Sequence, residues 1–118
     1  MIIYKFEKLE VWKLAMEFNL LSYKIAEKLP DSEKFNLSSL LRRASTSIAL
    51  NIAEGSTRQT NAEQKRFLSY VIRSHIEVIA CFRLIESRKY LQGSNDFQDY
   101  EELGIKLFSK LQSFRKAI

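Results

Sequence analysis

The stretch from Asn51 to Glu63, NIAEGSTRQTNAE, is the first place to look for chemistry, because it joins polar side chains to one of the three glycines. A phosphate-binding loop would need more glycine and a Lys-Ser or Lys-Thr pair to hold phosphate and metal, and the stretch has neither. We therefore interpret it as a turn between two helices. Gly55 would take the left-handed conformation that commonly ends a helix, and Thr60 with Glu63 matches the capping box that begins the next one.

A turn does not explain two side chains of this stretch. Asn51 lies near the apolar stripe of the preceding helix and would need hydrogen-bond partners if it were buried. Glu54 lies in the last helical turn, where the helix dipole disfavours a negative charge, and Arg58 is the nearest candidate cation. We interpret both residues as packing or subunit contacts. A catalytic Glu54 would require a pocket that supplies a second polar group.

The other reactive side chains argue against an enzyme. His75 and Cys81 are the only residues of their types. Both lie in apolar helical runs, which predicts a packed, hydrogen-bonded histidine and a small buried hydrophobe. Zinc spacings of Cys and His are absent, and Ile72 stands where a di-iron Glu-x-x-His pair would need its glutamate. We expect no catalytic residues, no metal and no cofactor.

Basic residues give the main indication of a ligand. The net charge is +5, and residues 34–89 hold ten Lys and Arg against four Asp and Glu, whereas the flanking segments are nearly neutral. Such a surface attracts nucleic acid or another polyanion; a solvated surface that aids solubility is the alternative. Arg66, Arg73 and Arg88 fall within about 60° of one another around their helix. The candidate nucleic-acid-binding residues are Arg42, Arg43, Arg58, Lys65, Arg66, Arg73 and Arg88.

Four helical segments must position these groups. Apolar residues recur at spacings of three and four within residues 9–29, 35–54, 61–90 and 96–116. Pro30 ends the first segment, and Gly93 suits the end of the third, with Ser94 or Asn95 as a cap for the fourth. With only one proline and three glycines, the chain divides more readily into long helices than into short strands. We predict one all-α domain, an antiparallel up-down-up-down four-helix bundle.

Some positions predict contacts beyond a single core. The second segment is rich in Ser, Thr and Ala, which lets another helix approach closely; binding of a ligand by its Ser and Thr residues is the alternative. The third has apolar residues over about half its circumference, which indicates contact with its own bundle and with another subunit; a central helix wrapped by its own bundle is the alternative. Trp12, Met16 and Tyr23 widen the apolar stripe of the first segment, whereas Ile105 and Phe108 lie off that of the fourth and are expected to be exposed or at an interface.

The chain shows no sign of a membrane segment. No run approaches the roughly 20 apolar residues of a membrane span. The N-terminal MIIYKFEKLE acquires charge by Lys5, so it lacks an apolar stretch of signal-peptide length. We expect a cytoplasmic protein with no membrane partner.

Three stretches resemble one family: FEKLEVWKLAMEF, LRRASTSIALNIAEGSTR and FLSYVIRSHIEV. They are similar to the bacterial four-helix-bundle proteins encoded within intervening sequences of 23S ribosomal RNA genes. The most specific part is S-I-x-x-N-I-A-E-G, from Ser47 to Gly55. The resemblance implies an antiparallel bundle that assembles as a ring, usually a pentamer. The family is also similar to the accessory variability protein of diversity-generating retroelements, a basic pentameric bundle that binds nucleic acid and its reverse transcriptase.

These observations predict a non-enzymatic, ring-forming helical bundle. We expect a homo-oligomer, with a pentamer as the expected number, that binds RNA or DNA, RNA first, through repeated basic patches. The alternative is a protein-interaction scaffold that docks a partner such as a reverse transcriptase and has no direct nucleic-acid role.

Overall fold

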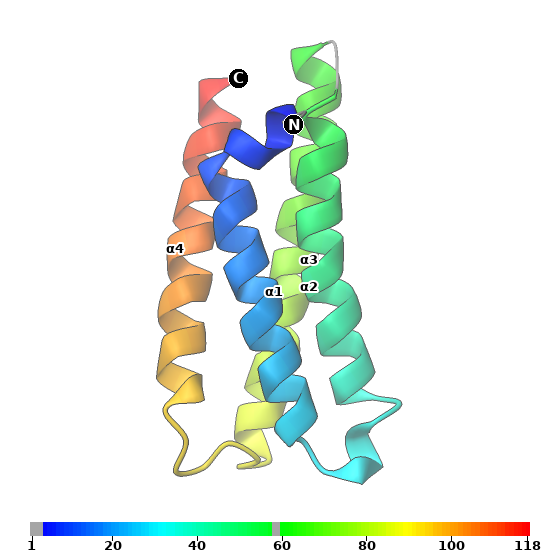
Figure 1. Ribbon diagram of the computed structural model, residues 1–118, viewed down its shortest axis with the longest axis vertical. Helices are drawn as coiled ribbons and strands as arrows, with labels where there is room; N and C mark the ends of the chain where they lie inside the picture. The colour runs from blue at the N-terminus through cyan, green and yellow to red at the C-terminus, as the bar shows by residue number, and fades with distance from the viewer. Residues whose placement is uncertain (1–3, 58–59) are drawn as a thin grey trace.

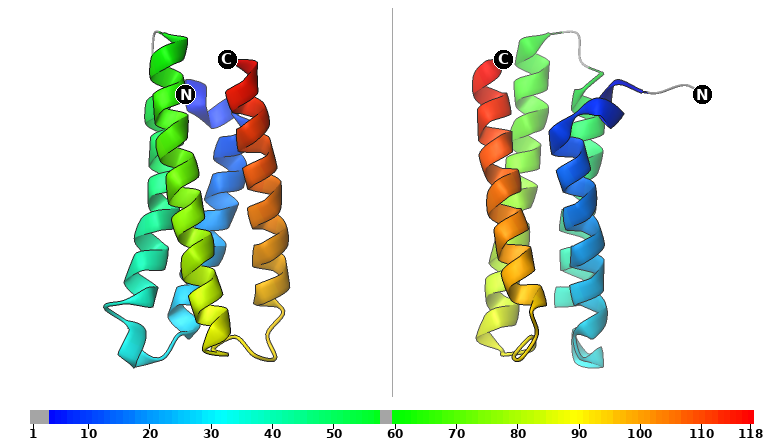
Figure 2. Two further views of the ribbon diagram at one scale, coloured as in Figure 1. Left: turned by 180° about the vertical axis from the view of Figure 1, so that it is seen from behind. Right: turned by 60° about the vertical axis from the view of Figure 1, so that its left-hand side comes forward.

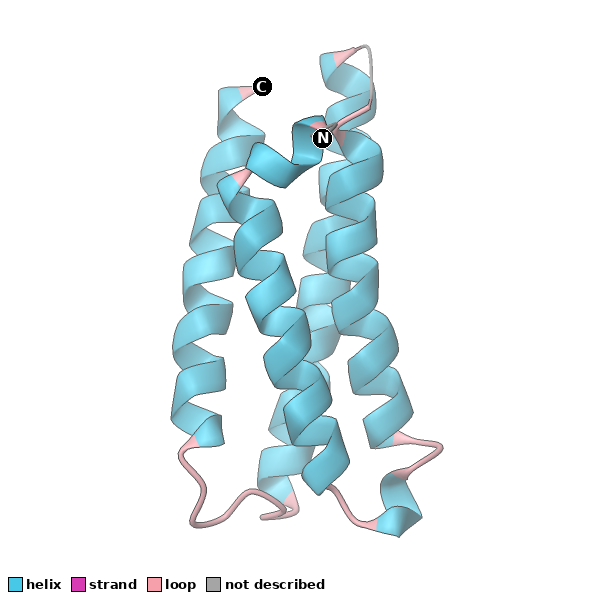
Figure 3. Cartoon of the chain, in the orientation of Figure 1, coloured by secondary structure: helices cyan, strands magenta, loops and turns pink. Residues whose placement is uncertain are grey.

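The computed structural model describes residues 4–57 and 60–118, which form four long helices (Figure 1). The helices are α1 Glu10–Lys28, α2 Leu37–Gly55, α3 Asn61–Ser87 and α4 Asp96–Ala117. Short 3-10 helices precede the first two, η1 Lys5–Lys8 and η2 Asp31–Glu33. Within the described residues there is no strand (Figure 3). Successive helices run in opposite directions along the long axis (Figures 1 and 2), so the prediction of an antiparallel four-helix bundle is confirmed.

The four helices are arranged around one core. Contacts join α1 to α2, α2 to α3, α3 to α4 and α4 to α1. The pair α1 and α2 therefore forms one face of the bundle, and α3 and α4 form the opposite face (Figure 2). None of the helices in the described ranges has the length and apolar character that crossing a membrane requires.

An aromatic cluster holds the centre of the core. The ring of Tyr100 on α4 lies 4.6 Å from that of Phe18 on α1 and 4.3 Å from that of Phe82 on α3. All three side chains are fully buried, and burying one such side chain contributes about 1.5–3 kcal/mol. The Tyr100 hydroxyl lies 2.7 Å from Ser22 Oγ, which satisfies its polar end. Burial raises the pKa of Tyr100, so the hydroxyl stays protonated.

Small polar side chains fix the register between α1 and α2. Asn19 Nδ2 donates to Ser45 Oγ and to Thr46 Oγ1, each at 3.1 Å. Nearer the connecting loop, Ser38 Oγ donates to the Ala26 carbonyl at 3.1 Å. The predicted close approach of a neighbouring helix to the Ser-rich second segment is therefore confirmed. These bonds also fix which residues of α1 and α2 lie side by side.

The prediction for Gly55 is wrong in its physical reason. Gly55 is the last residue of α2, and Gly93 is the glycine with a positive φ among the described residues. A Cβ on Gly55 would lie 2.9 Å from Phe67 Cβ on α3. The glycine therefore lets two helices approach closely and does not supply a left-handed turn.

The third helix ends earlier than predicted. It stops at Ser87, three residues short of the expected end. Lys89 has a φ of 61°, a left-handed conformation that α-helix excludes. Gly93, with a φ of 85°, belongs to the following loop and does not end the helix. Ser94 Oγ accepts from the backbone N–H of Asp96 at 3.1 Å, at the start of α4.

His75 and Cys81 are buried, as predicted. His75 Nε2 donates to the Gly104 carbonyl at 2.9 Å, and the imidazole lies between the rings of Phe18 and Phe108. The burial lowers the pKa of His75. Burial also raises the pKa of the Cys81 thiol to about 11, so the sulfur is a poor nucleophile.

Candidate nucleic-acid interface

An open hollow of about 540 Å³ lies along the solvent-facing side of α2. Tyr23 on α1 forms one edge of it, and residues of α2 form the rest: Ser39, Arg42, Arg43, Thr46, Ser47, Leu50, Asn51 and Glu54. These α2 residues recur at the spacing of a helix face. Leu41, Ala44 and Ile48 of the opposite side are buried in the core, so the polar side chains must face outward.

Two arginines dominate the charge of this hollow. Arg43 is exposed and Arg42 is partly buried. Among the described residues neither forms an ion pair with a carboxylate. Glu54 is the acidic residue in the lining, but it follows Arg42 by twelve positions, about 18 Å along the helix axis. The arginine end of the hollow therefore keeps its positive charge.

Neutral hydrogen-bonding groups lie between the arginines and Glu54. Asn51 Nδ2 donates to the carbonyl of Ser47 at 2.9 Å and to its Oγ at 3.0 Å. Ser47 Oγ in turn lies 2.9 Å from Ser74 Oγ on α3. Asn51 thus has the partners that a polar group in this position needs, and the chain of bonds ties the hollow to the neighbouring helix.

The predicted binding residues of α3 do not line the hollow. Arg73 directly precedes Ser74, which contacts the hollow through Ser47, and Arg73 is exposed. Arg66 lies two turns away, about 10 Å along α3, with its guanidinium 5.8 Å from the Phe67 ring centre. Lys65 is exposed, but a step of about 100° from Arg66 turns it to another side of the helix.

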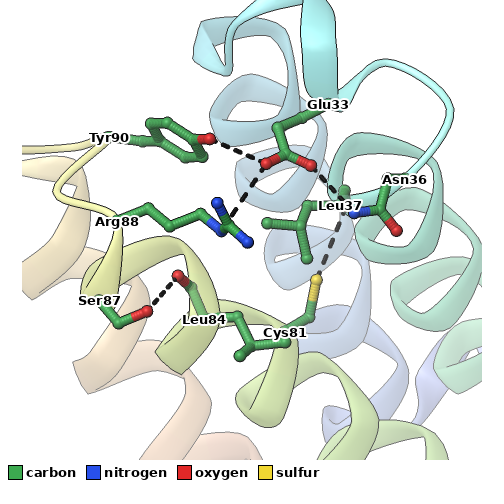
Figure 4. A network of polar contacts seen from close by, with 8 residues as sticks. All are labelled: Glu33, Asn36, Leu37, Cys81, Leu84, Ser87, Arg88 and Tyr90. Carbon is green, nitrogen blue, oxygen red and sulfur yellow. Dashed lines mark hydrogen bonds and ion pairs between the residues drawn. The ribbon is translucent and has the colours of Figure 1, made fainter.

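Arg88 does not line the hollow, contrary to its grouping with the other arginines. It lies beside Glu33 (Figure 4). Its Nε lies 3.9 Å from Glu33 Oε2. Glu33, in η2, is buried and also accepts from the Tyr90 hydroxyl at 2.8 Å and from Asn36 Nδ2 at 3.1 Å. The hydrogen bond from Tyr90 lowers the pKa of Glu33. Glu33 precedes Arg88 by 55 positions in the sequence. The contact between them therefore helps to hold the segment after α3 against η2.

The turn between α2 and α3 holds two of the residues singled out in the sequence, Arg58 and Thr60. Arg58 lies outside the described residues, and so does its expected contact with Glu54, which is exposed. At the start of α3, Thr60 Oγ1 accepts from the backbone N–H of Glu63 at 3.1 Å. This bond is the first half of the expected capping box, and it satisfies one of the free N–H groups at the helix start.

Sequence reasoning missed Tyr23 as a residue of this surface. It was assigned to the apolar stripe of the first segment, whereas its side chain is 41% exposed and lines the hollow. Met16, assigned to the same stripe, is 43% exposed. The available signal was the spacing of Tyr23 four residues after Asn19, a polar residue at the edge of the stripe. Asn19 hydrogen-bonds to Ser45, so this edge of the α1 stripe faces α2.

Comparison with known proteins identifies the family. A family model described as 23S rRNA-intervening sequence protein matches residues 7–113. None of the curated proteins compared with the chain matches it. The family match includes all of α1, α2 and α3 and most of α4, and therefore every residue that lines the hollow. The chain belongs to the family of 23S rRNA-intervening sequence proteins.

Proposed function

We propose that this protein is a non-enzymatic bundle that binds nucleic acid, RNA in the first place, in the cytoplasm. The observation that carries the proposal is the arginine end of the α2 hollow. There Arg42 and Arg43 lack carboxylate partners among the described residues. Guanidinium groups bind phosphate in bidentate fashion, and hydroxyl and amide side chains are common phosphate contacts. Ser39, Thr46 and Asn51 supply such groups in the same hollow.

We further propose that the bundle assembles into a homo-oligomeric ring, with a pentamer as the expected number. Two opposite faces carry exposed apolar residues. On the face of α1 and α2, Met16, Leu20 and Leu50 line a groove of about 320 Å³. On the face of α3 and α4, Ile76 and Ile105 line one of about 310 Å³.

Unlike surfaces on opposite faces favour a head-to-tail contact, which generates a ring when the rotation closes. Each closed ring would repeat the basic hollow once per subunit. Repetition supports nucleic-acid binding, because several weak phosphate contacts on one assembly add avidity.

A filter-binding titration against salt tests the nucleic-acid proposal. We expect the affinity for RNA to fall steeply with salt, and the double variant Arg42→Ala/Arg43→Ala to lower the slope of log affinity against log salt by about two. The matched control is Arg115→Ala/Lys116→Ala, which removes the same charge from exposed positions at the end of α4 and should keep the slope. A flat salt response, or no binding at low salt, contradicts the proposal.

Light scattering tests the ring. The wild-type protein should have the mass of several subunits at micromolar concentration. Leu20→Glu and Ile105→Glu should each give smaller species, because each places a charge in one half of the contact. Leu84→Glu is the control, since Leu84 is 54% exposed but lines neither groove. A monomeric wild type contradicts the ring.

The groove between α3 and α4 favours a second candidate function, a scaffold in which a partner protein such as a reverse transcriptase occupies this groove in place of a neighbouring subunit. Its lining is mainly apolar, with the Arg83 and Glu101 pair at one side, and exposed apolar grooves are typical of protein-binding sites. A complex that survives nuclease treatment, combined with no direct binding of nucleic acid by the purified protein, would replace the first proposal with this one.

A further inference from the structure

The hollow on α2 has an exposed aromatic side chain beside its arginines. The bonds from Asn19 to Thr46 and from Ser38 to the Ala26 carbonyl set the register of the antiparallel pair α1 and α2. In that register Tyr23 lies across from Arg42. Both line the same hollow, so an aromatic side chain and an arginine lie toward the same end of it.

The Tyr23 ring is available to a ligand. Its side chain is 41% exposed, and among the described residues it stacks on no other aromatic ring. Tyr23 is also absent from the lining of the apolar groove assigned to the subunit contact. Thr46 and Leu50 line both that groove and the hollow, so the two surfaces adjoin.

We infer that this end of the hollow binds a single-stranded segment of nucleic acid, with one base stacked on Tyr23 and the adjoining phosphates on Arg42 and Arg43. The inference rests on the proposed function. Single strands present the faces of their bases, which stack on aromatic side chains, whereas a duplex covers those faces by its own stacking. A duplex therefore offers no base face on which the Tyr23 ring could stack.

Charge sets the extent of the contact. The α2 part of the hollow runs from Ser39 to Glu54, about 22 Å at the rise of an α-helix. The carboxylate of Glu54 repels phosphate at the far end. The strand therefore meets the protein at Tyr23, Arg42 and Arg43, and hydrogen bonds from Ser39 and Thr46 are within the same part of the surface.

Three probes test the inference: a labelled 20-nucleotide single-stranded RNA, the single-stranded DNA of the same sequence, and the RNA duplex. Each is titrated against the wild type, Tyr23→Ala and Tyr23→Phe. We expect the wild type to bind both single strands at least about tenfold more tightly than the duplex. Tyr23→Ala should weaken single-strand binding about 5- to 150-fold. Tyr23→Phe should stay within about twofold of the wild type, because the ring stacks without its hydroxyl.

The salt dependence separates stacking from phosphate contact. Tyr23→Ala should keep the wild-type slope against salt, whereas Arg42→Ala/Arg43→Ala should lower it. Equal binding of duplex and single strands, together with an unchanged affinity of Tyr23→Ala, overturns the single-strand inference and leaves phosphate binding in place. Absence of salt-dependent binding to all three probes overturns the proposed function itself. Thermal unfolding of each variant checks that the fold is intact.

Discussion

Basic side chains in two regions of this bundle have opposite surroundings. The first region is the end of the bundle with the α1–α2 and α3–α4 connections, called the loop end below. There Lys24 and Lys28 of α1 contact Asp96 of α4, and Arg88 contacts Glu33 of η2. Both carboxylates are buried. In the hollow on α2, Arg42 and Arg43 have no such partner among the described residues.

The difference teaches that a count of basic residues does not locate a binding surface. A cation beside a buried carboxylate is held in place by that partner and stabilises the fold. A cation without a carboxylate partner has no neighbouring charge that offsets its own, and it is therefore the better candidate for binding an anionic ligand. Arg88 and Arg42 are equally basic in the sequence, but in the structure Arg88 has a carboxylate partner, whereas Arg42 has none among the described residues.

The largest expected effect concerns the packing that presents the hollow. Gly55→Ala places a Cβ 2.9 Å from Phe67 Cβ, close to the α3 backbone, and should lower the free energy of unfolding by about 1–3 kcal/mol. Gly104→Ala is the matched control, because its new Cβ would meet the flexible end of Ile79 at 3.3 Å. Urea unfolding measures both. If the two variants had equal stability, the close approach of α2 and α3 would not depend on Gly55.

Removing charges at the loop end should destabilise the protein more than removing charges from the hollow. Asp96→Asn removes the charge that Lys24 and Lys28 contact and should cost about 1–2 kcal/mol, since the carboxylate is buried although the lysines are largely exposed. Arg42→Ala/Arg43→Ala should change the free energy of unfolding by less than about 0.5 kcal/mol. Chemical denaturation compares them. If Arg42→Ala/Arg43→Ala were destabilising, the contrast between the two regions would be wrong, because the arginines of the hollow would then have a structural role.

The pH dependence of stability should separate the core from the loop end. Burial lowers the pKa of His75 from its ordinary 6.5. His75 therefore binds a proton more readily in the unfolded chain than in the folded protein. This contribution is fully present above pH 6.5 and is lost as the pH falls below it. Contacts with Lys28 lower the pKa of Asp96 from 3.8, and the Tyr90 bond lowers that of Glu33 from 4.5. Their contribution is present above those values and is lost as the pH falls further.

Urea unfolding at pH 7.5, 5.5 and 3.5 measures the two losses. His75→Gln keeps a donor for the Gly104 carbonyl and should flatten the change between pH 7.5 and 5.5. Asp96→Asn should flatten part of the change between pH 5.5 and 3.5. An unchanged wild-type stability between pH 7.5 and 5.5 would contradict the assignment to His75.

The smallest expected effect concerns Glu54. Glu54→Gln removes the acidic residue from the lining of the hollow and should increase RNA affinity by less than about threefold at low salt, because the charge lies roughly 18 Å from Arg42. Fluorescence anisotropy at 50 and 200 mM salt measures the change. A tenfold or larger increase would place phosphate contacts along the whole hollow and not at its arginine end.

Much of the architecture was readable from the sequence. The apolar stripes predicted four helices, and their bounds agree with the structure to within three residues. In the fourth segment Tyr100, Leu107 and Leu111 recur at helical spacing and are buried, because the periodicity of apolar residues decides which side of an amphipathic helix meets the core. Ile105, placed off that stripe, is 64% exposed.

The residues of the candidate site were harder to predict, because residues of the same type have different surroundings in the folded protein. Arg88 was grouped with Arg66 and Arg73 by helical angle, but α3 ends at Ser87, so the angle no longer applies beyond it. Tyr23 was interpreted as widening the apolar stripe of the first segment, but in the structure it is 41% exposed and lines the hollow on α2.

The sequence by itself determined the helices, the side of each that faces the core, and the family. Those properties depend on local periodicity and on residue types at fixed spacing. The tertiary structure decided that Gly55 permits close packing, that Arg88 meets Glu33, and that Tyr23 shares a hollow with Arg42. Each of these depends on the register between two helices or on a partner distant in the chain, and register arises from the packing of whole faces.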